Sequence, residues 1–235
     1  DITLWVNGKK QGSSGISGGA GSGSYTELTA PVANPPEGDV VSIQDYGAIP
    51  NDDKDDSHAI QKALNSGKNV VFPDGVYDIS RDLYLDQKAM KGKSIFAENN
   101  RKAMLRSAKG NSIHCHYFYH IKGIEFKKVT LEIFGGDGKN HSRFITDNKF
   151  IHPFQDTYTS IKIPKDQKVE NLVIKRDSII GGLYGILVGD KGNGILKDSY
   201  IVENYSKGCR RHYIFNAGAV NVMIRNNVIQ GEETI

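Results

Sequence analysis

The sequence predicts an all-β protein whose main part is a single-stranded parallel β-helix, a solenoid built from rungs of short strands. Four segments share a form in which Asp or Asn precedes Asn or Ser and then a mostly hydrophobic pair: Asp147–Ile151, Asp177–Ile180, Asp198–Ile201 and Asn226–Ile229. Their first residues are 30, 21 and 28 positions apart, close to the ~20–30-residue period of a solenoid rung. Alternating apolar runs precede three of them, and a fainter copy lies at Ile121–Leu131. An antiparallel sandwich would show more two-residue hairpin turns than this region does.

Residues 1–38 are predicted to form an extended neck ahead of this solenoid. Ile2–Val6 is prone to form a strand, and Asn7-Gly8 is a strong signal for a hairpin turn. Because so short a segment cannot fold alone, we expect the strand to pair with an upstream domain or with another copy of the chain. Between Gln11 and Ser24, six glycines and five serines fill 11 of 14 positions, which predicts a flexible linker.

Residues 39–80 are predicted to form a strand, a short helix and two further strands. Val40–Ile43 is the first strand, and apolar residues from Ala59 to Leu64 recur at helical spacing before Gly67. Asp56 or Ser57 is the expected N-cap, at the end of an acidic cluster that suits the positive end of the helix dipole. A calcium-binding EF-hand loop does not fit, since the chain has Asp and Lys where that loop needs Gly and Glu.

The strand–helix–strand unit ends in two short strands and resembles a known family. Pro73-Asp74-Gly75 breaks the β-prone run after Asn69 and is turn chemistry. The segments Ile43–Ala48, Asp55–Leu64 and Val70–Tyr77 are similar to the opening of pectate-lyase-superfamily proteins, above all bacteriophage tailspikes. In those proteins a capping helix and a Phe/Leu-Pro-x-Gly-x-Tyr hairpin begin a right-handed parallel β-helix. The resemblance implies that fold, with residues 39–80 as its cap, and carries over no catalytic residue.

Residues 81–235 are predicted to be the first rungs of the β-helix. The last rung, Val222–Ile229, is followed by six residues with no capping helix, whereas terminal repeats of a solenoid need a cap. We therefore expect further rungs beyond residue 235.

Composition excludes several functions. The 30 basic and 27 acidic residues give a net charge of +3 and are scattered, which argues against nucleic-acid binding. No apolar stretch approaches the ~18–20 residues of a membrane span. Cys115 and Cys209 are too far apart for a metal or redox motif, and we expect both to be small buried hydrophobic residues. No cofactor and no metal are expected.

Acidic residues outside the repeated corner are the candidate catalytic groups. Hydrolysis of a polysaccharide needs two carboxylates roughly 5–9 Å apart, whereas a lyase needs a base and a cation beside a uronate. Neighbouring rungs lie ~4.8 Å apart, so carboxylates on adjacent rungs have suitable spacing. Asp177 and Asp198 occupy equivalent corner positions, which favours a role in the turn. The catalytic candidates are Asp156, Asp190 and Glu203.

Cationic and aromatic side chains are the candidate substrate-binding residues. Arg210, Arg211 and His212 form a cluster suited to an anionic sugar or a phosphate. Tyr158 and Tyr184 can offer a sugar an apolar face with a polar edge.

Two further motifs have simpler interpretations. His114 and His116 project from one side of a predicted strand, with Cys115 on the other, and stacking or packing is favoured over zinc binding. Gly135–His141 is a glycine-rich run without phosphate-loop spacing and is predicted to be a long loop between rungs.

The resemblance implies a tailspike or tail appendage that acts at the host cell surface. It implies a homotrimer, attached through its neck to phage tail or baseplate proteins, that binds a bacterial surface polysaccharide and cleaves it by hydrolysis or β-elimination. Neck strands from three chains would then pair about a three-fold axis. Two alternatives stay open: a secreted polyuronate (pectate-like) lyase, and a non-catalytic receptor-binding or structural stalk.

Overall fold

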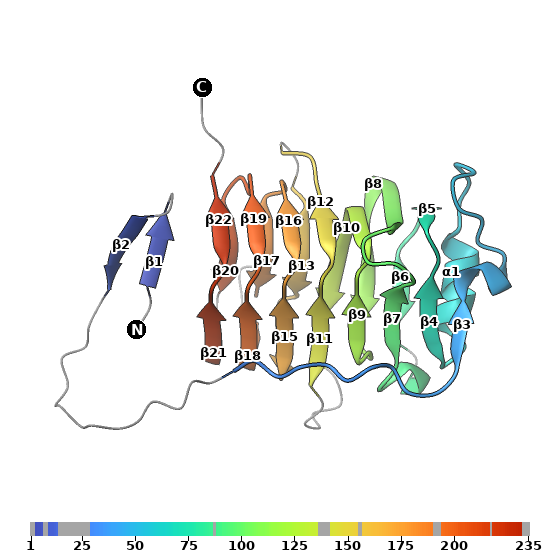
Figure 1. Ribbon diagram of the computed structural model, residues 1–235, viewed down its shortest axis with the longest axis horizontal. Coiled ribbons are helices and arrows are strands. Elements are labelled where there is room, and N and C mark those ends of the chain that lie inside the picture. The colour runs from blue at the N-terminus through green and yellow to red at the C-terminus, as the bar shows by residue number, and fades with distance from the viewer. Residues whose placement is uncertain are drawn as a thin grey trace.

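The protein is an all-β parallel solenoid of about 7 turns, which confirms the predicted fold class (Figure 1). The computed structural model describes residues 3–6, 9–13, 29–86, 88–135, 142–154, 157–189, 194–216 and 218–231. The stacked strands form three faces, each named here after one of its strands.

The β4 face is a ladder of eight parallel strands. They are β3 (Val40–Ser42), β4 (Asn69–Phe72), β7 (Ser94–Ala97), β9 (His120–Lys122), β11 (Arg143–Thr146), β15 (Leu172–Lys175), β18 (Ile195–Val202) and β21 (Ala219–Arg225), and β14 (Lys168–Glu170) adds to the edge of β18.

The other two faces belong to one bent sheet. The β12 face holds β5 (Gly75–Ile79), the first halves of β8 (Ala103–Cys115) and β10 (Glu125–Ile133), β12 (Lys149–Ile151), β16 (Ser178–Ile180), β19 (Tyr205–Lys207) and β22 (Val228–Gln230). The β13 face holds β6 (Leu83–Leu85), the second halves of β8 and β10, β13 (Thr159–Ile163), β17 (Tyr184–Val188) and β20 (His212–Asn216).

The core is a narrow apolar column inside the solenoid. Each strand points alternate side chains inward. Side chains at equivalent positions of successive rungs therefore stack on one another. The β4 face contributes isoleucines from five successive rungs to this column: Ile95, Ile121, Ile145, Ile174 and Ile201. Phe126 and Phe150 stack across neighbouring rungs with ring centroids 5.1 Å apart. Burial of each such side chain contributes about 1.5–3 kcal/mol.

One α-helix, α1 (Ser57–Leu64), closes the end of the column beside β3 and β4 (Figure 1). Asp56 occupies the N-cap position, as predicted, but its side chain makes no cap hydrogen bond. Its Oδ1 instead accepts from Ile49 N–H at 2.9 Å, and Asp55 Oδ1 accepts from Ser57 N–H at 3.1 Å. The capping carboxylate is therefore one residue earlier than the sequence predicts, because Asp56 faces the preceding turn.

Two predictions for residues 39–80 need correction. The residues after β3 form a 3₁₀ helix, η1 (Ile43–Tyr46), so the first strand ends at Ser42. A second 3₁₀ helix, η2, spans Lys88–Met90. β4 and β5 do not form a hairpin, since β4 pairs with β3 and β7 while β5 pairs with β8. The Pro-Asp-Gly turn is thus a corner between two faces of the solenoid.

The N-terminal strand also differs from the prediction. β1 (Thr3–Val6) pairs antiparallel with β2 (Lys9–Ser13) of the same chain. This pairing agrees with the turn signal at Asn7-Gly8, whereas the expected partner was another domain or copy. The start of the predicted linker is part of β2, and the rest of it, residues 14–24, lies outside the described residues.

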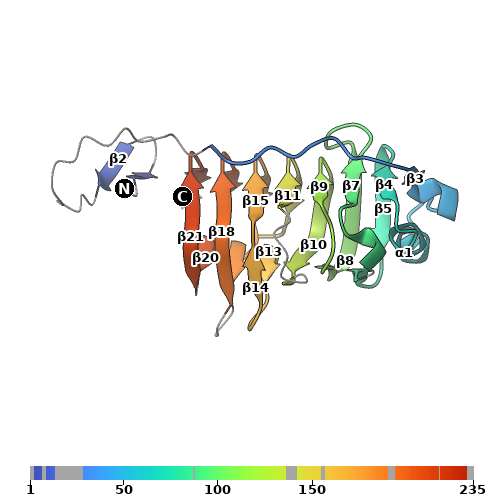
Figure 2. The same cartoon turned by 90° about the horizontal axis from the view of Figure 1, so that it is seen from below.

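Residues 29–38 run along the β4 face for the length of the solenoid (Figure 2). Asn34 N–H donates to Tyr119 Oη at 2.8 Å, and Asn69 Nδ2 donates to the carbonyl of Glu37 at 2.8 Å. Pro31 lies against the late rungs, near Met223. The segment is therefore a strap held by side chains of the solenoid.

The corner between the β4 and β12 faces carries a ladder of buried polar side chains. Asn148 Nδ2 donates to Asp177 Oδ1 at 3.0 Å, Asp177 N–H to Asn204 Oδ1 at 2.9 Å, and Asn204 Nδ2 to Asn227 Oδ1 at 2.9 Å. The repeated polar corner of the sequence is therefore a ladder of Asn and Asp side chains, whose members are 29, 27 and 23 residues apart. Asp198, predicted to be equivalent to Asp177, instead lies within β18.

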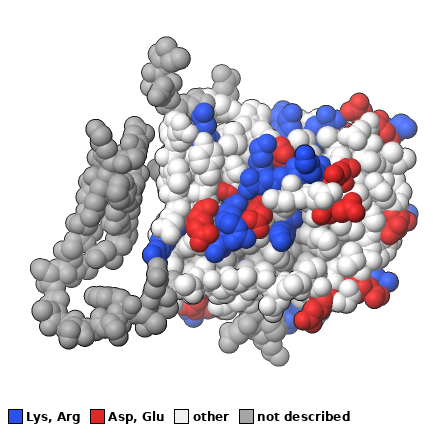
Figure 3. Space-filling model, in the orientation of Figure 1, with Lys and Arg blue, Asp and Glu red and all other residues white. Residues whose placement is uncertain are grey.

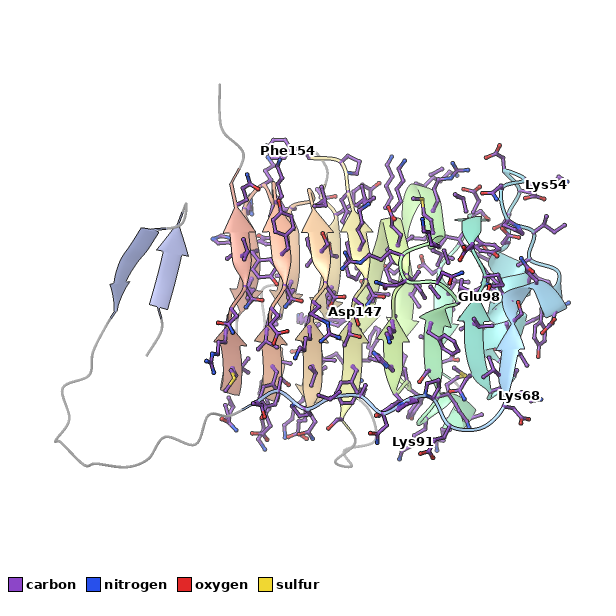
Figure 4. All side chains as sticks on the ribbon, in the orientation of Figure 1. Lys54, Lys68, Lys91, Glu98, Asp147 and Phe154 are labelled. Atoms are coloured by element: carbon purple, nitrogen blue, oxygen red, sulfur yellow. The ribbon has the colours of Figure 1, made fainter. Side chains whose placement is uncertain are left out.

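The residue before each ladder member has a left-handed backbone. Asp147, Arg176, Glu203 and Asn226 have φ of 62, 56, 59 and 55°, a conformation that costs an L-residue roughly 1–2 kcal/mol. The ladder hydrogen bonds and the buried column offset this cost. Asp147 is labelled in Figure 4, where it lies between β11 and β12, and it accepts two hydrogen bonds from Arg176, at 2.7 and 2.9 Å.

In the part of the chain that the structure describes, no helix has the length and apolar character to cross a membrane. Cys115 is buried as predicted, and Cys209 is half-buried beside the core.

Candidate functional site

The β13 face carries an open groove of about 350 Å³. In Figure 1 its strands β13, β17 and β20 lie behind the β12 face. The groove is lined by side chains of β8, β10, β13 and β17, and Glu132, Lys162, Tyr158 and Tyr184 are among them. A second hollow of about 320 Å³ lies beside α1 and is lined by Asp82 and Tyr84, among others. The linings of the two hollows meet where Ser112 N–H donates to Asp82, and we call the two hollows together the β13-face groove.

The pairing of neighbouring strands places four functional side chains in a row along this groove. Tyr84 pairs with His114, His114 with Glu132, and Glu132 with Lys162, so the four lie on successive rungs. All four neighbour inward-facing core residues and therefore point outward. The fold thus gathers residues that are 18–30 positions apart in sequence.

The row is linked by close contacts between carboxylate oxygens and the nitrogen atoms of Lys162 and His114. Glu132 Oε1 lies 3.1 Å from Lys162 Nζ, and its Oε2 lies 3.3 Å from His114 Nδ1. The other ring nitrogen of His114 lies 3.4 Å from Asp82 Oδ2. Only 16% of the Glu132 side chain is exposed, so its carboxylate acts in a partly desolvated environment. The imidazole therefore stands between two carboxylates.

Asp82 is held in its ionised form. Burial raises the pKa of Asp82, but hydrogen bonds from Ser112 N–H, Asn111 and His114 outweigh it and hold the pKa below the ordinary value. The Ser112 N–H to Asp82 Oδ1 distance is 2.8 Å. Asp82 is thus suited to stabilise positive charge, whereas Glu132 has a cation at one oxygen and an imidazole at the other.

Aromatic rings flank the row, and the two histidines stack as predicted. Tyr84 stacks on His114 with ring centroids 4.7 Å apart, and His116 stacks on Phe134 at 4.2 Å. Burial lowers the pKa of His116. Among the described residues no three metal-ligating side chains form a group that could hold an ion.

Tyr158 and Tyr184, both predicted to bind substrate, line this same groove. Tyr158 Oη donates to the carbonyl of Lys109 at 3.1 Å, and its ring stacks on His152 at 5.5 Å. Burial lowers the pKa of His152 to about 4, so the ring beneath Tyr158 is neutral at physiological pH. These contacts fix the tyrosine plane at the wall of the groove.

The predicted cationic cluster meets Tyr184. Arg211 Nη1 donates to Tyr184 Oη at 3.2 Å, and the His212 ring is parallel to the Tyr184 ring at 6.1 Å. The Arg210 side chain is exposed, and its backbone N–H donates to the carbonyl of Gly182 at 2.8 Å. The chain therefore brings one end of the predicted binding cluster to the groove.

Of the three predicted catalytic acids, Glu203 alone lies in the part of the chain that the structure describes, and it is not at the groove. Glu203 lies at the corner between the β4 and β12 faces and pairs with Lys175 at 3.1 Å. Asp156 and Asp190 lie outside the described residues, so their roles stay predictions. Sequence reasoning missed Asp82, Glu132 and Lys162 because their link is strand register. The signal that could have found them is the alternation in β10, where Glu132 stands between two core residues.

Comparison with protein families gives one match. A family model described as rhamnogalacturonase A/epimerase, pectate lyase-like matches residues 40–235. No curated protein matches the sequence.

Solved structures share the fold at low sequence identity. The catalytic unit of a thermostable GH87 α-1,3-glucanase from Streptomyces thermodiastaticus strain HF3-3 aligns with a TM-score of 0.53 and 15% identity, over 86% of this chain and 42% of that chain. The Agl-KA catalytic domain aligns with a TM-score of 0.42 and 15% identity, over 88% of this chain and 46% of that one. ORF18 of Geobacillus virus E2 aligns with a TM-score of 0.34 and 12% identity, over 78% and 48%. The chain thus spans less than half the length of each, and the likeness shows the fold alone.

Proposed function

The chain belongs to the rhamnogalacturonase A/epimerase, pectate lyase-like family, and from this premise we propose that it binds a polysaccharide along the β13-face groove and cleaves it. The observation that carries the proposal is the row Asp82–His114–Glu132–Lys162, which places two carboxylates, an imidazole and an ammonium group on successive rungs. A long groove suits a linear polymer, since it leaves both ends of the substrate free.

The row holds the groups that either cleavage reaction needs. In hydrolysis, one carboxyl group protonates the glycosidic oxygen and a second activates water or attacks the sugar. Glu132 and Asp82, on opposite nitrogens of His114, supply that pair. In β-elimination, a base removes the proton beside a uronate carboxylate whose charge a cation neutralises. His114 and Lys162 supply the base and the cation.

The tyrosines orient the sugar chain. Tyr84 and Tyr158 expose ring faces along the groove and are held by stacking on His114 and His152. Such rings bind the apolar faces of pyranoses while their hydroxyl groups stay hydrated. Arg211 and Lys162 favour a polymer that carries negative charge.

A test of cleavage uses the purified chain and a panel of polysaccharides. The panel holds bacterial capsules, lipopolysaccharide O-chains, polygalacturonate and α-1,3-glucan, and the readouts are new reducing ends and the ultraviolet absorbance of unsaturated products. We expect shorter products from at least one polymer. New reducing ends without ultraviolet absorbance would show that the protein is a hydrolase. Absorbance of unsaturated products would show that it is a lyase. Binding without products contradicts cleavage and leaves the stalk function.

We also propose that the chain is part of a homotrimeric phage tailspike that acts on the host surface and is joined to the virion tail through its N-terminal residues. The similarity of Ile43–Tyr77 to tailspike openings supports this role. Light scattering of the purified chain should then give three times its mass of 25.9 kDa. A mass of one chain at micromolar concentration would contradict the trimer.

A further inference from the structure

The β4 face has a second hollow, of about 310 Å³, over β15, β18 and β21. It shares no lining residue with the β13-face groove. Its volume lies at the lower end of the ~300–1,000 Å³ typical of ligand sites. The strap contributes one wall through Pro31, so two parts of the chain far apart in sequence form this hollow.

Two parallel rows of side chains form the rest of its lining. Val173, Tyr200 and Met223 are paired in register and make an apolar row across three rungs. Asn171, Asp198 and Asn221 precede them by two positions in each rung and make a polar row. Because rungs repeat every ~4.8 Å, both rows follow the long axis of the solenoid.

Backbone geometry explains part of the polar row. Asn171, Asp198 and Asn221 have φ of 55, 47 and 53°, and Asn and Asp tolerate this left-handed conformation better than other side chains. That preference accounts for the residue types. It does not account for a half-buried tyrosine and a methionine placed beside them at the floor of an open hollow.

The electrostatics of the hollow are close to neutral. Asn221 Nδ2 donates to Asp198 Oδ1 at 2.7 Å, and Lys197 Nζ lies 3.4 Å from Asp198 Oδ2. Lys197 also pairs with Glu170, which pairs with Lys168 in turn, so two ammonium groups balance two carboxylates beside the hollow. In Figure 3 the surface over the lower parts of β15, β18 and β21 is mostly uncharged, below the band of charges at the corner. The hollow is thus suited to an uncharged ligand with many hydroxyl groups.

We propose that this hollow is a second saccharide-binding site, which takes a neutral pyranose unit of a polysaccharide. Tyr200 and Met223 contact the C–H face of the ring, with the Tyr200 ring as the main stacking surface, while the buried Val173 supports them from the neighbouring rung. The amides of Asn171 and Asn221 and the carboxylate of Asp198 hydrogen-bond to its hydroxyl groups. The site binds without cleaving, and it stands whether or not the β13-face groove is catalytic. A second site on the same rigid body would raise the avidity for a polymer.

The test compares two tyrosine variants on an array of neutral and acidic bacterial polysaccharides and glucans. Both carry the change Glu132→Gln, so that bound polymers stay intact. Tyr200→Ala removes the aromatic ring that stacks on the sugar, and we expect about tenfold weaker binding to at least one neutral polymer. Tyr205→Ala is the matched control, because Tyr205 is a half-exposed tyrosine of the β12 face whose hydroxyl group bonds to Gln230. It should leave binding unchanged.

Each outcome decides the proposal. Weaker binding by Tyr200→Ala alone supports it, and so do chemical-shift changes of Tyr200 on addition of methyl glucoside or methyl galactoside. Equal binding by both variants overturns it, as does the absence of any bound neutral polymer. Circular dichroism of both variants shows whether the fold is intact. If Tyr200→Ala is misfolded, Asn221→Ala at the exposed rim replaces it, with the same expected loss.

Discussion

Replacement of Glu132 by Gln is expected to lower the rate of polysaccharide cleavage by about 10²–10⁴-fold, the range that one acid–base group contributes. Gln has the shape of Glu and can still accept a hydrogen bond from Lys162, but it cannot take up or release a proton at neutral pH. The change therefore removes proton transfer while it preserves the groove. The rate is measured on a polymer that the wild-type chain cleaves, as new reducing ends or unsaturated product per unit time.

Glu170→Gln is the matched control for this prediction. Glu170 is also a glutamate between two lysines, with Lys168 at 3.0 Å and Lys197 at 3.2 Å, but it lies on β14 at the other side of the solenoid. The control should keep full activity, because Glu170 does not line the β13-face groove, where cleavage is proposed to take place. If Glu132→Gln keeps more than a tenth of the wild-type rate, or if both variants lose activity equally, Glu132 is not the acid–base group.

Asp177→Asn is expected to raise the free energy of unfolding at pH 8 by roughly 1–3 kcal/mol, the cost of one unpaired buried polar group. Asp177 is 1% exposed, and its Oδ2 has no hydrogen-bond partner. At the equivalent positions, Asn204 and Asn227 use the side-chain amide to donate to the carbonyls of Ile174 and Ile201, at 3.1 and 2.7 Å. Asparagine at 177 would supply the missing donor of the ladder.

Protonation of Asp177 gives this prediction its pH dependence. Burial raises the pKa of Asp177 well above its usual value of 3.8, the nearby Asp147 adds to the effect, and hydrogen bonds from Asn148 and the charge of Arg101 oppose it. A group whose folded-state pKa is raised stabilises the fold below the unfolded-state pKa, and that stability is lost as the pH rises through the folded-state pKa. The wild-type protein should therefore lose stability between pH 4 and pH 8 through this group. Asp177→Asn should not.

Urea unfolding of both proteins at pH 4 and pH 8 measures the effect. The advantage of Asp177→Asn should be small at pH 4, where the acid is protonated and can itself donate, and larger at pH 8. Asp166→Asn is the control, since Asp166 is an exposed aspartate near Lys165 with a similar left-handed backbone. Its effect should be small and equal at both pH values. An equal advantage of Asp177→Asn at both pH values would mean that Asp177 does not titrate in this range.

The fold could be predicted from short local patterns, and the positions of its corners could not. Asn148 and Asn227 each follow an Asp or an Asn residue. This two-residue pattern is visible in the sequence and marks the corner. Asn204 follows Glu203, so its corner lacks that form, and the sequence instead predicts a corner at the similar pair Asp198-Ser199. The structure corrects this because Asp198, like Asn171 and Asn221 on the neighbouring rungs, has a left-handed backbone within the β4 face and does not lie at the corner.

Half of the candidate site could be predicted in the same way. The sequence predicts that Tyr158 and Tyr184 bind a sugar through their aromatic rings, and both residues line the β13-face groove. Glu132 and Lys162 are ordinary charged residues of alternating strands, 30 positions apart. Nothing in their local sequence marks them, because their relation is created only when β10 and β13 pair.

The sequence by itself determined that this chain is a β-solenoid with one helix near its start and with a narrow apolar column as its core. Local spacing is enough for that conclusion, since each rung repeats the same alternation of inward and outward side chains. The tertiary structure alone decided which outward side chains become neighbours. In a parallel solenoid neighbours come from different rungs, and loops of unequal length set the offset between them. This is why Asp82, His114, Glu132 and Lys162 form a row in space and no motif in the sequence.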